Sequence, residues 1–152
     1  MNSIKKIGAW LWSSDNDNRS MIPRIIVGLV FLSEGIQKFL YPEMVGVGRF
    51  ENIGFENPEF WAYFVASFEV VCGVFILTGL LTRLATIPLL TIMATALITT
   101  KIPILLNEGF WFMAHAARTD FAMAMLLIFL LVNGPGKFSA DYKFFHFPFS
   151  GT

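Results

Sequence analysis

Four apolar segments of about twenty residues each constrain the fold of this chain more than any other feature of its sequence. Twenty residues of α-helix are about 30 Å long, which matches the hydrocarbon thickness of a bilayer. Turns that contain Gly, Pro or polar residues separate the segments. The sequence therefore predicts an all-α integral membrane protein with a four-transmembrane-helix bundle. The predicted spans cover residues of about 22–41, 60–81, 84–106 and 114–133.

The composition agrees with this fold class. The chain is 55% hydrophobic and 14% charged, with a formal net charge of zero. These values are too apolar for a small soluble domain, and they place the chain in a lipid bilayer. Because no basic stripe is present, nucleic acid is not expected as a partner.

The segments on either side of the bundle set its predicted orientation. Residues 1–20 are expected to form an N-terminal interfacial segment with a short helix, residues 21–136 the four-helix transmembrane domain, and residues 137–152 a cytoplasmic tail. Cations gather on the side of both termini, which predicts that both lie in the cytoplasm and that the protein is a multi-pass protein of the cell (inner) membrane. These cations are Lys5, Lys6, Arg19, Arg24, Arg83, Lys137 and Lys143.

The sequence carries no motif of a familiar catalytic or metal site. Its single cysteine, Cys72, excludes an internal disulfide, a CxxC redox pair and a cysteine-based metal cluster. No GxSxG, HExxH or P-loop pattern is present. We therefore assign no catalytic residue, no metal and no intrinsic cofactor, and whether the chain is an enzyme stays open.

One carboxylate, Glu69, lies near the middle of the second apolar segment, with no cation beside it in sequence. An ionised group at that depth costs about 2.5–3.5 kcal/mol even on the lenient insertion scale. Either another helix supplies its partner or Glu69 is protonated in place. Both interpretations predict a polar site inside the bundle.

Further polar side chains fall in the same outer half of the predicted bundle. Charges left singly in lipid are costly, so we expect them to pair with one another. Glu34 and Lys38 are one helical turn apart, in the favourable order for an ion pair. The candidate ligand-binding or proton-relay residues are Glu34, Gln37, Lys38, Glu69, Lys101, His115, Arg118 and Asp120.

Plainer interpretations stand beside this one. Lys38 and Lys101 can reach the headgroups with their long side chains, and His115 fits a hydrogen-bonded residue at the membrane interface. Thr91, Thr95 and Thr99 form a hydroxyl stripe that can face the charges or pack helices. The charged cluster can also be purely structural. The glycine-punctuated segment 43–59 suggests a compact loop over the outer mouth, as a lid or a packed connector.

Three strings of the sequence resemble the DoxX family of small four-helix membrane proteins (DoxX/DoxD-like). They are RIIVGLVFLSEGIQKFLYP, FEVVCGVFILTGLLTRLATI and NGPGKFSAD. The resemblance follows the order of all four segments. It implies a four-helix membrane protein with family positions at Arg24, Lys38, Glu69, Arg83 and Asp141. It also implies a link to quinone-dependent oxidoreductase complexes for some relatives and an accessory or chaperone-like role for others.

Two functions follow as hypotheses. The first is a redox-associated, quinone-linked membrane subunit that has a buried polar pocket in the outer half of the bundle and binds a quinone or a small anion there. The second is a non-enzymatic accessory or assembly (chaperone-like) subunit of a larger complex, whose ion pairs fix helix register. Both predict partner proteins or a homo-oligomer in the membrane. A small-solute transporter is weaker, because the sequence shows no inverted repeat.

Overall fold

The computed structural model describes residue 10 and residues 18–145, and within this part of the chain it contains helices and no strand. The predicted all-α membrane fold is therefore confirmed. The predicted interfacial helix of residues 1–20 lies outside the described residues, apart from Trp10 and residues 18–20. The helices, in chain order, are α2 (Met21–Leu40), α3 (Pro42–Val45), α4 (Val47–Ile53), α5 (Pro58–Thr78), α6 (Thr82–Ala96), the π-helical η1 (Leu97–Lys101), α7 (Ile102–Glu108), α8 (Phe110–Asn133) and α9 (Ala140–Phe145).

Three stretches are long and apolar enough to cross a membrane: α5, the continuous run Thr82–Glu108, and α8. The first helix, α2, carries Arg24, Glu34 and Lys38, and it meets the same criterion only together with α3 and α4. The chain bends by 117° between α2 and that pair. Residues 18–145 thus contain three spans by this measure, or four when the bent pair is counted.

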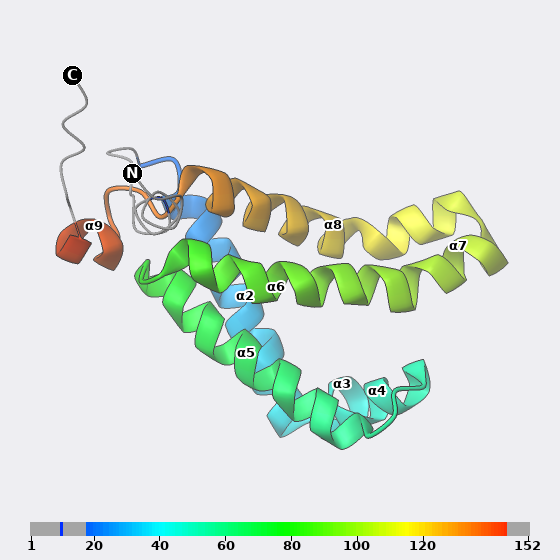
Figure 1. The fold of residues 1–152 in the computed structure, drawn as a ribbon. Coiled ribbons are helices and arrows are strands. Elements are labelled where there is room, and N and C mark those ends of the chain that lie inside the picture. Colours follow the sequence, from blue (N-terminus) through cyan, green and yellow to red (C-terminus); the bar gives the residue numbers. More distant parts are fainter. Residues whose placement is uncertain (1–9, 11–17, 146–152) are drawn as a thin grey trace, which may run out of the picture.

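The helices form two arms (Figure 1). The first arm consists of α2 and α5, and the second of α6, η1, α7 and α8. The arms meet at the end where α9 lies, which we call the closed end. They diverge toward the other end, where α4 and α7 lie, which we call the open end.

Glycines let the two helices of the first arm pack closely. A Cβ atom added at Gly35 would lie 2.8 Å from the Ala66 carbonyl oxygen, and one at Gly73 would lie 2.9 Å from the Leu32 nitrogen. Small residues of this kind allow backbones in a membrane to approach one another. The close packing brings residues of α2 and α5 within reach of each other along the whole arm.

The two arms share an apolar core. It includes Val27 and Phe31 from α2, Ile76 from α5, Leu89 from α6 and Leu127 from α8, all with an exposed fraction of 2% or less. This core holds the arms together near the closed end.

Two buried arginines bind the ends of helices at the closed end. Arg24 donates hydrogen bonds to the carbonyl oxygens of Ile76, Leu77, Pro135 and Phe138, at 2.7–3.0 Å. Arg83 donates to the last turns of α8, at the Leu131 and Val132 oxygens, and to the Trp10 oxygen. The last carbonyls of a helix lack partners within it and carry partial negative charge, so a guanidinium complements them.

Asp141 completes the closed end from the start of α9. Its carboxylate accepts hydrogen bonds from the backbone N–H groups of Leu81 (2.8 Å) and Thr82 (3.1 Å), which open α6. Burial raises the pKa of the Asp141 carboxyl, although the two N–H donors and the nearby Arg24 and Arg83 act in the opposite direction. The family-like positions Arg24, Arg83 and Asp141 therefore satisfy helix ends.

Candidate functional site

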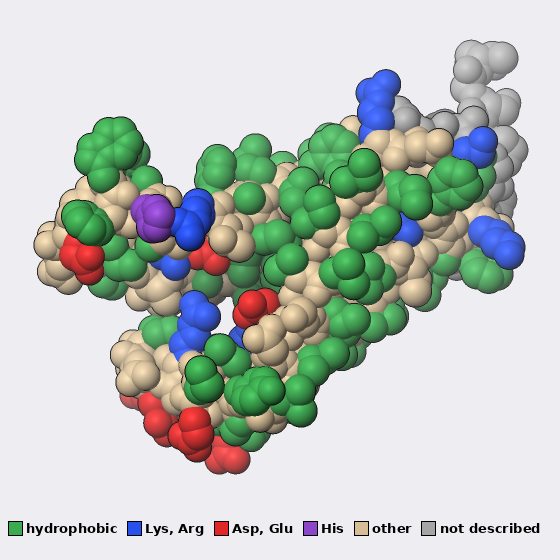
Figure 2. All heavy atoms as spheres, turned by 180° about the vertical axis from the view of Figure 1, so that it is seen from behind, with side chains coloured by type: hydrophobic (Ala, Val, Ile, Leu, Met, Phe, Trp, Pro, Cys, Tyr) green, Lys and Arg blue, Asp and Glu red, His purple; other side chains and the backbone are tan. Residues whose placement is uncertain are grey.

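A cleft of about 440 Å³ separates the two arms toward the open end. Figure 2, a view from behind, shows the arms apart at this end with basic and acidic side chains in the gap. All the long helices and α4 contribute to its walls. The charged residues that line it are Glu34 and Lys38 from α2, Arg49 from α4, Glu69 from α5 and Asp120 from α8.

A buried ion pair forms one side of this cleft. The Lys38 Nζ atom lies 2.7 Å from Glu69 Oε2 and 3.7 Å from Glu34 Oε2. The side chains of Lys38 and Glu69 are 7% and 4% exposed, whereas that of Glu34 is 45% exposed. The partner of Glu69 thus comes from another helix, α2, which is the first of the two alternatives that the sequence left open. One ammonium serves two carboxylates.

A second ion pair joins η1 to α8. The Lys101 Nζ atom lies 3.0 Å from Asp120 Oδ2, and both side chains are largely buried. Asp120 lines the cleft, whereas Lys101, on the neighbouring η1, does not. Lys101 lies in a π-helical turn just before Pro103, whose missing N–H removes one regular backbone hydrogen bond. The pair therefore ties the irregular turn to the facing helix.

Hydroxyl groups cover the wall that the second arm contributes. Thr91, Thr95, Thr99 and Thr100 line the cleft. Each of these hydroxyls donates to the carbonyl oxygen four residues earlier, at 2.6–3.1 Å. The stripe expected from the sequence thus faces the cleft, but its protons are already used. It offers a bound molecule acceptor lone pairs.

Aromatic rings cover part of the opposite wall. Four aromatic residues line the cleft, and the ring of each contacts the ring of the next: Phe50, Phe55, Trp61 and Phe64. The ring centroids of Phe50 and Phe55 are 5.3 Å apart, those of Phe55 and Trp61 6.2 Å, and those of Trp61 and Phe64 5.8 Å, all edge to face. The cleft is therefore aromatic on one side and hydroxylic on the other.

Besides Lys101, three of the candidate residues lie outside the cleft. Gln37 donates to the Ser33 hydroxyl at 2.9 Å on its own helix. Arg118 contacts the His115 ring at 2.9 Å, and both side chains are exposed. Arg118 and Asp120 are two residues apart, so they point to directions about 200° apart on a helix. That spacing was a signal that only one of the two could face the other helices.

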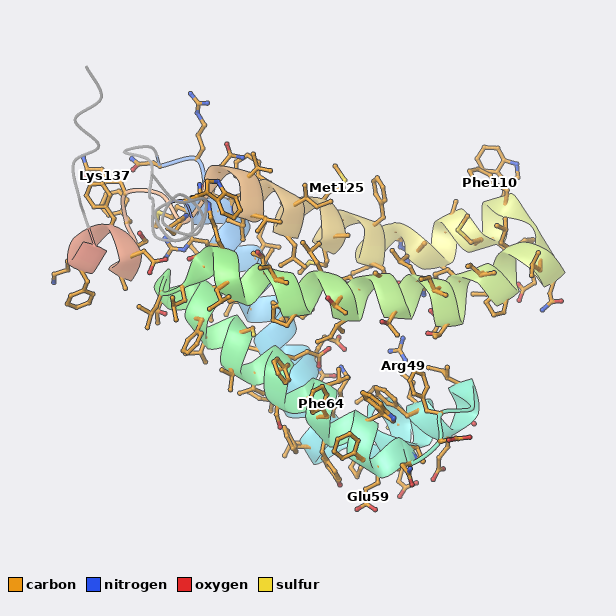
Figure 3. All side chains as sticks on the ribbon, viewed as in Figure 1. Arg49, Glu59, Phe64, Phe110, Met125 and Lys137 are labelled. Atoms are coloured by element: carbon orange, nitrogen blue, oxygen red, sulfur yellow. The ribbon has the colours of Figure 1, made fainter. Side chains whose placement is uncertain are left out.

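Arg49 is a charged residue of the cleft that was not among the predicted site residues. It lies on α4, in the segment expected to be a loop, and Figure 3 shows its side chain directed from α4 toward the second arm. The signal that could have identified it is a lone cation in segment 43–59, where the other charged residues are Glu43, Glu51, Glu56 and Glu59.

The chemistry available in the cleft is hydrogen bonding and proton exchange. Among residues 18–145, no group of His, Cys, Asp or Glu side chains is placed to hold a metal ion. The thiol of Cys72 is buried in the core between the arms. Lys38 and Arg49 can donate hydrogen bonds to the oxygen atoms of a bound molecule, and the carboxylates and Lys38 can exchange protons with it.

Comparisons with known proteins agree with this architecture. The DoxX family model matches residues 20–102. The chain is 54% identical over 126 residues to an uncharacterized membrane protein of Mycobacterium tuberculosis, a match that covers 79% of this chain and 77% of that protein. It is 31% identical over 124 residues to a Bacillus subtilis protein with the name "Putative oxidoreductase CatD", covering 80% and 84% of the two chains. No solved structure matches.

Proposed function

The chain belongs to the DoxX family of membrane proteins, and we propose that it is a redox-associated membrane subunit that binds a quinone-like molecule in the cleft between its arms. The proposal rests above all on the cleft itself. Its volume of about 440 Å³ lies within the range of small-molecule sites, and charged side chains meet aromatic rings in it. The name of the Bacillus subtilis relative points toward the same class of function.

The walls suit a flat ring that carries oxygen atoms. Aromatic side chains on the first arm and α4 can stack on such a ring, while cations beside them donate hydrogen bonds to its oxygens. Glu69 and Lys38 form the ion pair at which a proton can be held next to the ligand. Electrons would come from a partner protein that carries a redox centre, with a quinone as the cofactor-like ligand.

The proposed orientation follows from the distribution of cations. The closed end carries Arg24 on α2, Arg83 on α6 and Lys137 after α8. The open end carries Arg49 and Arg118 together with Glu43, Glu51, Glu56, Glu59 and Glu108, so its cations are outnumbered by carboxylates. The positive-inside rule then places the closed end at the cytoplasm and the mouth of the cleft at the opposite face of the cell membrane.

Equilibrium binding of a soluble quinone tests the function. Trp61 lines the cleft, so a bound quinone should quench tryptophan fluorescence of the purified protein in nanodiscs. We expect saturable quenching by menadione or decylubiquinone, weakened in Glu69→Gln and unchanged in Glu59→Gln, a carboxylate exposed outside the cleft. Quenching that is linear in quinone concentration, or identical in both variants, would contradict the proposal.

A second function has an observation of its own. Most charged residues that line the cleft are already paired within the chain. Lys38 pairs with Glu34 and Glu69, and Asp120 pairs with Lys101, which lies outside the cleft. Such pairs also suit an accessory or assembly subunit, in which they fix helix register. In that case the exchanged pair Lys38→Glu with Glu69→Lys should retain a stoichiometric partner in mild-detergent pulldown. For a quinone site, the same exchange should abolish quinone binding.

A further inference from the structure

The guanidinium of Arg49 differs from the other charges of the cleft because it has no partner. Among the described residues, it forms no hydrogen bond and no ion pair, whereas Glu34, Lys38, Glu69 and Asp120 all lie within 4 Å of an opposite charge. It acts on Glu69 only as a more distant positive charge. The Arg49 side chain is exposed and lines the cleft, so its N–H donors are open to an acceptor from outside the chain.

The segment that carries Arg49 is packed in place. Gly46 and Gly48 lie against the preceding turn, where an added Cβ would be 2.6 Å from the Lys38 oxygen and 2.1 Å from the Glu43 oxygen. At the other end, α4 closes on Gly54, with φ of 87°, and the Phe55 N–H donates to the Phe50 oxygen. The edge-to-face rings of Phe50 and Phe55 join α4 to Trp61. The position of Arg49 is therefore set by the fold.

The remaining walls determine which group Arg49 can bind. The threonine hydroxyls on the second arm have donated their protons to backbone carbonyls, so they offer only lone pairs. The Lys38 ammonium already serves two carboxylates. The Arg49 guanidinium, with five N–H donors in a planar fork, is the unpartnered cationic donor of the cleft.

We propose that Arg49 is the residue that selects the ligand, by binding an acceptor oxygen of an amphiphile whose apolar part lies against Phe50, Phe55, Trp61 and Phe64. The inference rests on the proposed function in taking the cleft as the binding site, and it adds the group that is recognised. The acceptor is a carbonyl oxygen in a quinone or a carboxylate oxygen in a fatty acid. The guanidinium fork fits both.

The test compares ligands with and without oxygen on the same variants. The full-length protein in nanodiscs is titrated with menadione, with 2-methylnaphthalene as the oxygen-free analogue, and with oleate, by tryptophan fluorescence. Arg49→Met removes the donors, and Arg49→Lys keeps the charge without the fork. Arg118→Met is the matched control, since Arg118 is an exposed arginine at the same end and lies outside the cleft. Thermal unfolding of each variant checks the fold.

We expect Arg49→Met to weaken menadione binding by about 10- to 100-fold, the value of a hydrogen bond to a charged group, and Arg49→Lys to weaken it less. Arg118→Met should bind as the wild type does, and 2-methylnaphthalene should be insensitive to both substitutions. Loss of affinity for both aromatic ligands in Arg49→Met would mean that Arg49 only supports the fold, and it would overturn the inference. Equal menadione affinity in the wild type and in Arg49→Met would also overturn the inference, but it would leave the proposed quinone binding unaffected.

The oleate titration separates the inference from the proposed function. If oleate binds in an Arg49-dependent way and menadione does not bind at all, Arg49 selects an oxygen group, but the ligand is a lipid carboxylate. The quinone function is then wrong and the inference is supported. If neither ligand saturates in the wild type, both proposals are overturned.

Discussion

At the scale of single residues, the buried charged side chains fall into two groups: some bind backbone carbonyls and others form ion pairs. Arg24 and Arg83 bind backbone carbonyls at the closed end. At the cleft, Lys38 pairs with Glu69, and Asp120 pairs with Lys101. The four hydrogen bonds of Arg24 engage four of its five N–H donors with backbone carbonyls of the closed end. We therefore assign Arg24 and Arg83 a structural role, and we assign the ion pairs of the cleft to the candidate site.

The buried ion pair gives the first prediction. Lys38→Met leaves Glu69 buried without its counter-charge, and breaking such a pair typically costs about 3–5 kcal/mol of the free energy of unfolding. The double variant Lys38→Met with Glu69→Met removes both charges and should recover most of that loss. Thermal unfolding in detergent measures both. A double variant as unstable as Lys38→Met alone would contradict the pairing.

Lys101→Met is the matched control for this prediction. Its pair with Asp120 is more exposed, at 15% and 23%, than the pair of Lys38 and Glu69. Water and headgroups can reach the remaining carboxylate, so the loss in stability should be smaller than that of Lys38→Met.

Asp141 predicts a pH dependence outside the spans. Burial raises the pKa of its carboxyl in the folded protein above the ordinary value of 3.8, so the folded state binds this proton more tightly than the unfolded state. The stabilisation from Asp141 is complete below that value and falls as pH rises through the folded pKa. The melting temperature of the wild type minus that of Asp141→Asn should therefore be largest below about pH 4 and should decrease as the pH rises. A difference in melting temperature that grows with pH would mean that folding lowers the pKa of Asp141, and it would contradict the prediction.

At the scale of helices, the turn between α5 and α6 depends on one glycine. Gly79 has φ of 71°, and an added Cβ would lie 2.5 Å from Ser139 Cβ and 2.7 Å from Arg24 Cζ. Gly54 also has positive φ, at 87°, but an added Cβ there meets nothing within 4 Å. Both positions have a left-handed backbone that only a residue with a side chain would strain, and they differ in packing.

Alanine at these two glycines separates the two effects. Gly54→Ala should lose about 1 kcal/mol of stability, the cost of a left-handed residue with a side chain. Gly79→Ala should lose about 1–3 kcal/mol more, because it also pushes against the Arg24 cluster. Urea or thermal unfolding of the two variants, side by side, gives the difference. Equal losses would show that the closed end tolerates displacement of Arg24.

The long helices could be predicted from the sequence, because apolar length and turn residues determine them. The predicted span 60–81 corresponds to α5, which ends at Thr78 because Gly79 turns the chain. The predicted span 84–106 corresponds to a longer run with a π-helical turn, Leu97–Lys101, before Pro103. That turn has no sequence signature of its own beyond the proline. The short helix α4 was not predicted, since seven residues give too few repeats for periodicity.

The site could be predicted only in part. The need for a partner at Glu69 followed from the cost of burial, but the choice of Lys38 depends on how closely Gly35 and Gly73 let α2 and α5 pack. Arg118 was grouped with Asp120 by depth, although helical geometry directs them apart. Arg49 enters the cleft only because α3 and α4 fold back at the end of α2.

At the scale of the whole molecule, the two ends are chemically different. The closed end is held by buried hydrogen bonds to helix ends, and the open end leaves the arms apart with aromatic and charged walls between them (Figures 1 and 2). We therefore expect a ligand to enter the cleft from the open end. The orientation of the ends in the membrane decides from which face it comes.

Cysteine labelling tests that orientation. Glu59 at the open end and Lys137 at the closed end are both exposed and are labelled in Figure 3. In a Cys72→Ser background, a membrane-impermeant maleimide added to intact cells should label Glu59→Cys and leave Lys137→Cys unlabelled until the cells are opened. The reverse pattern would place the cleft on the cytoplasmic side and would contradict the orientation predicted from the distribution of cations.

The central claim is that the cleft between the arms binds a quinone-like molecule, and photoaffinity mapping tests it most directly. The protein in nanodiscs is illuminated with a photoreactive quinone, with and without excess menadione, and the modified peptides are identified by mass spectrometry. We predict adducts on the cleft segments around Phe50–Phe55, Trp61–Glu69 and Thr91–Thr100, suppressed by menadione. Adducts confined to the exposed face around His115 and Arg118, or unaffected by menadione, would contradict the claim.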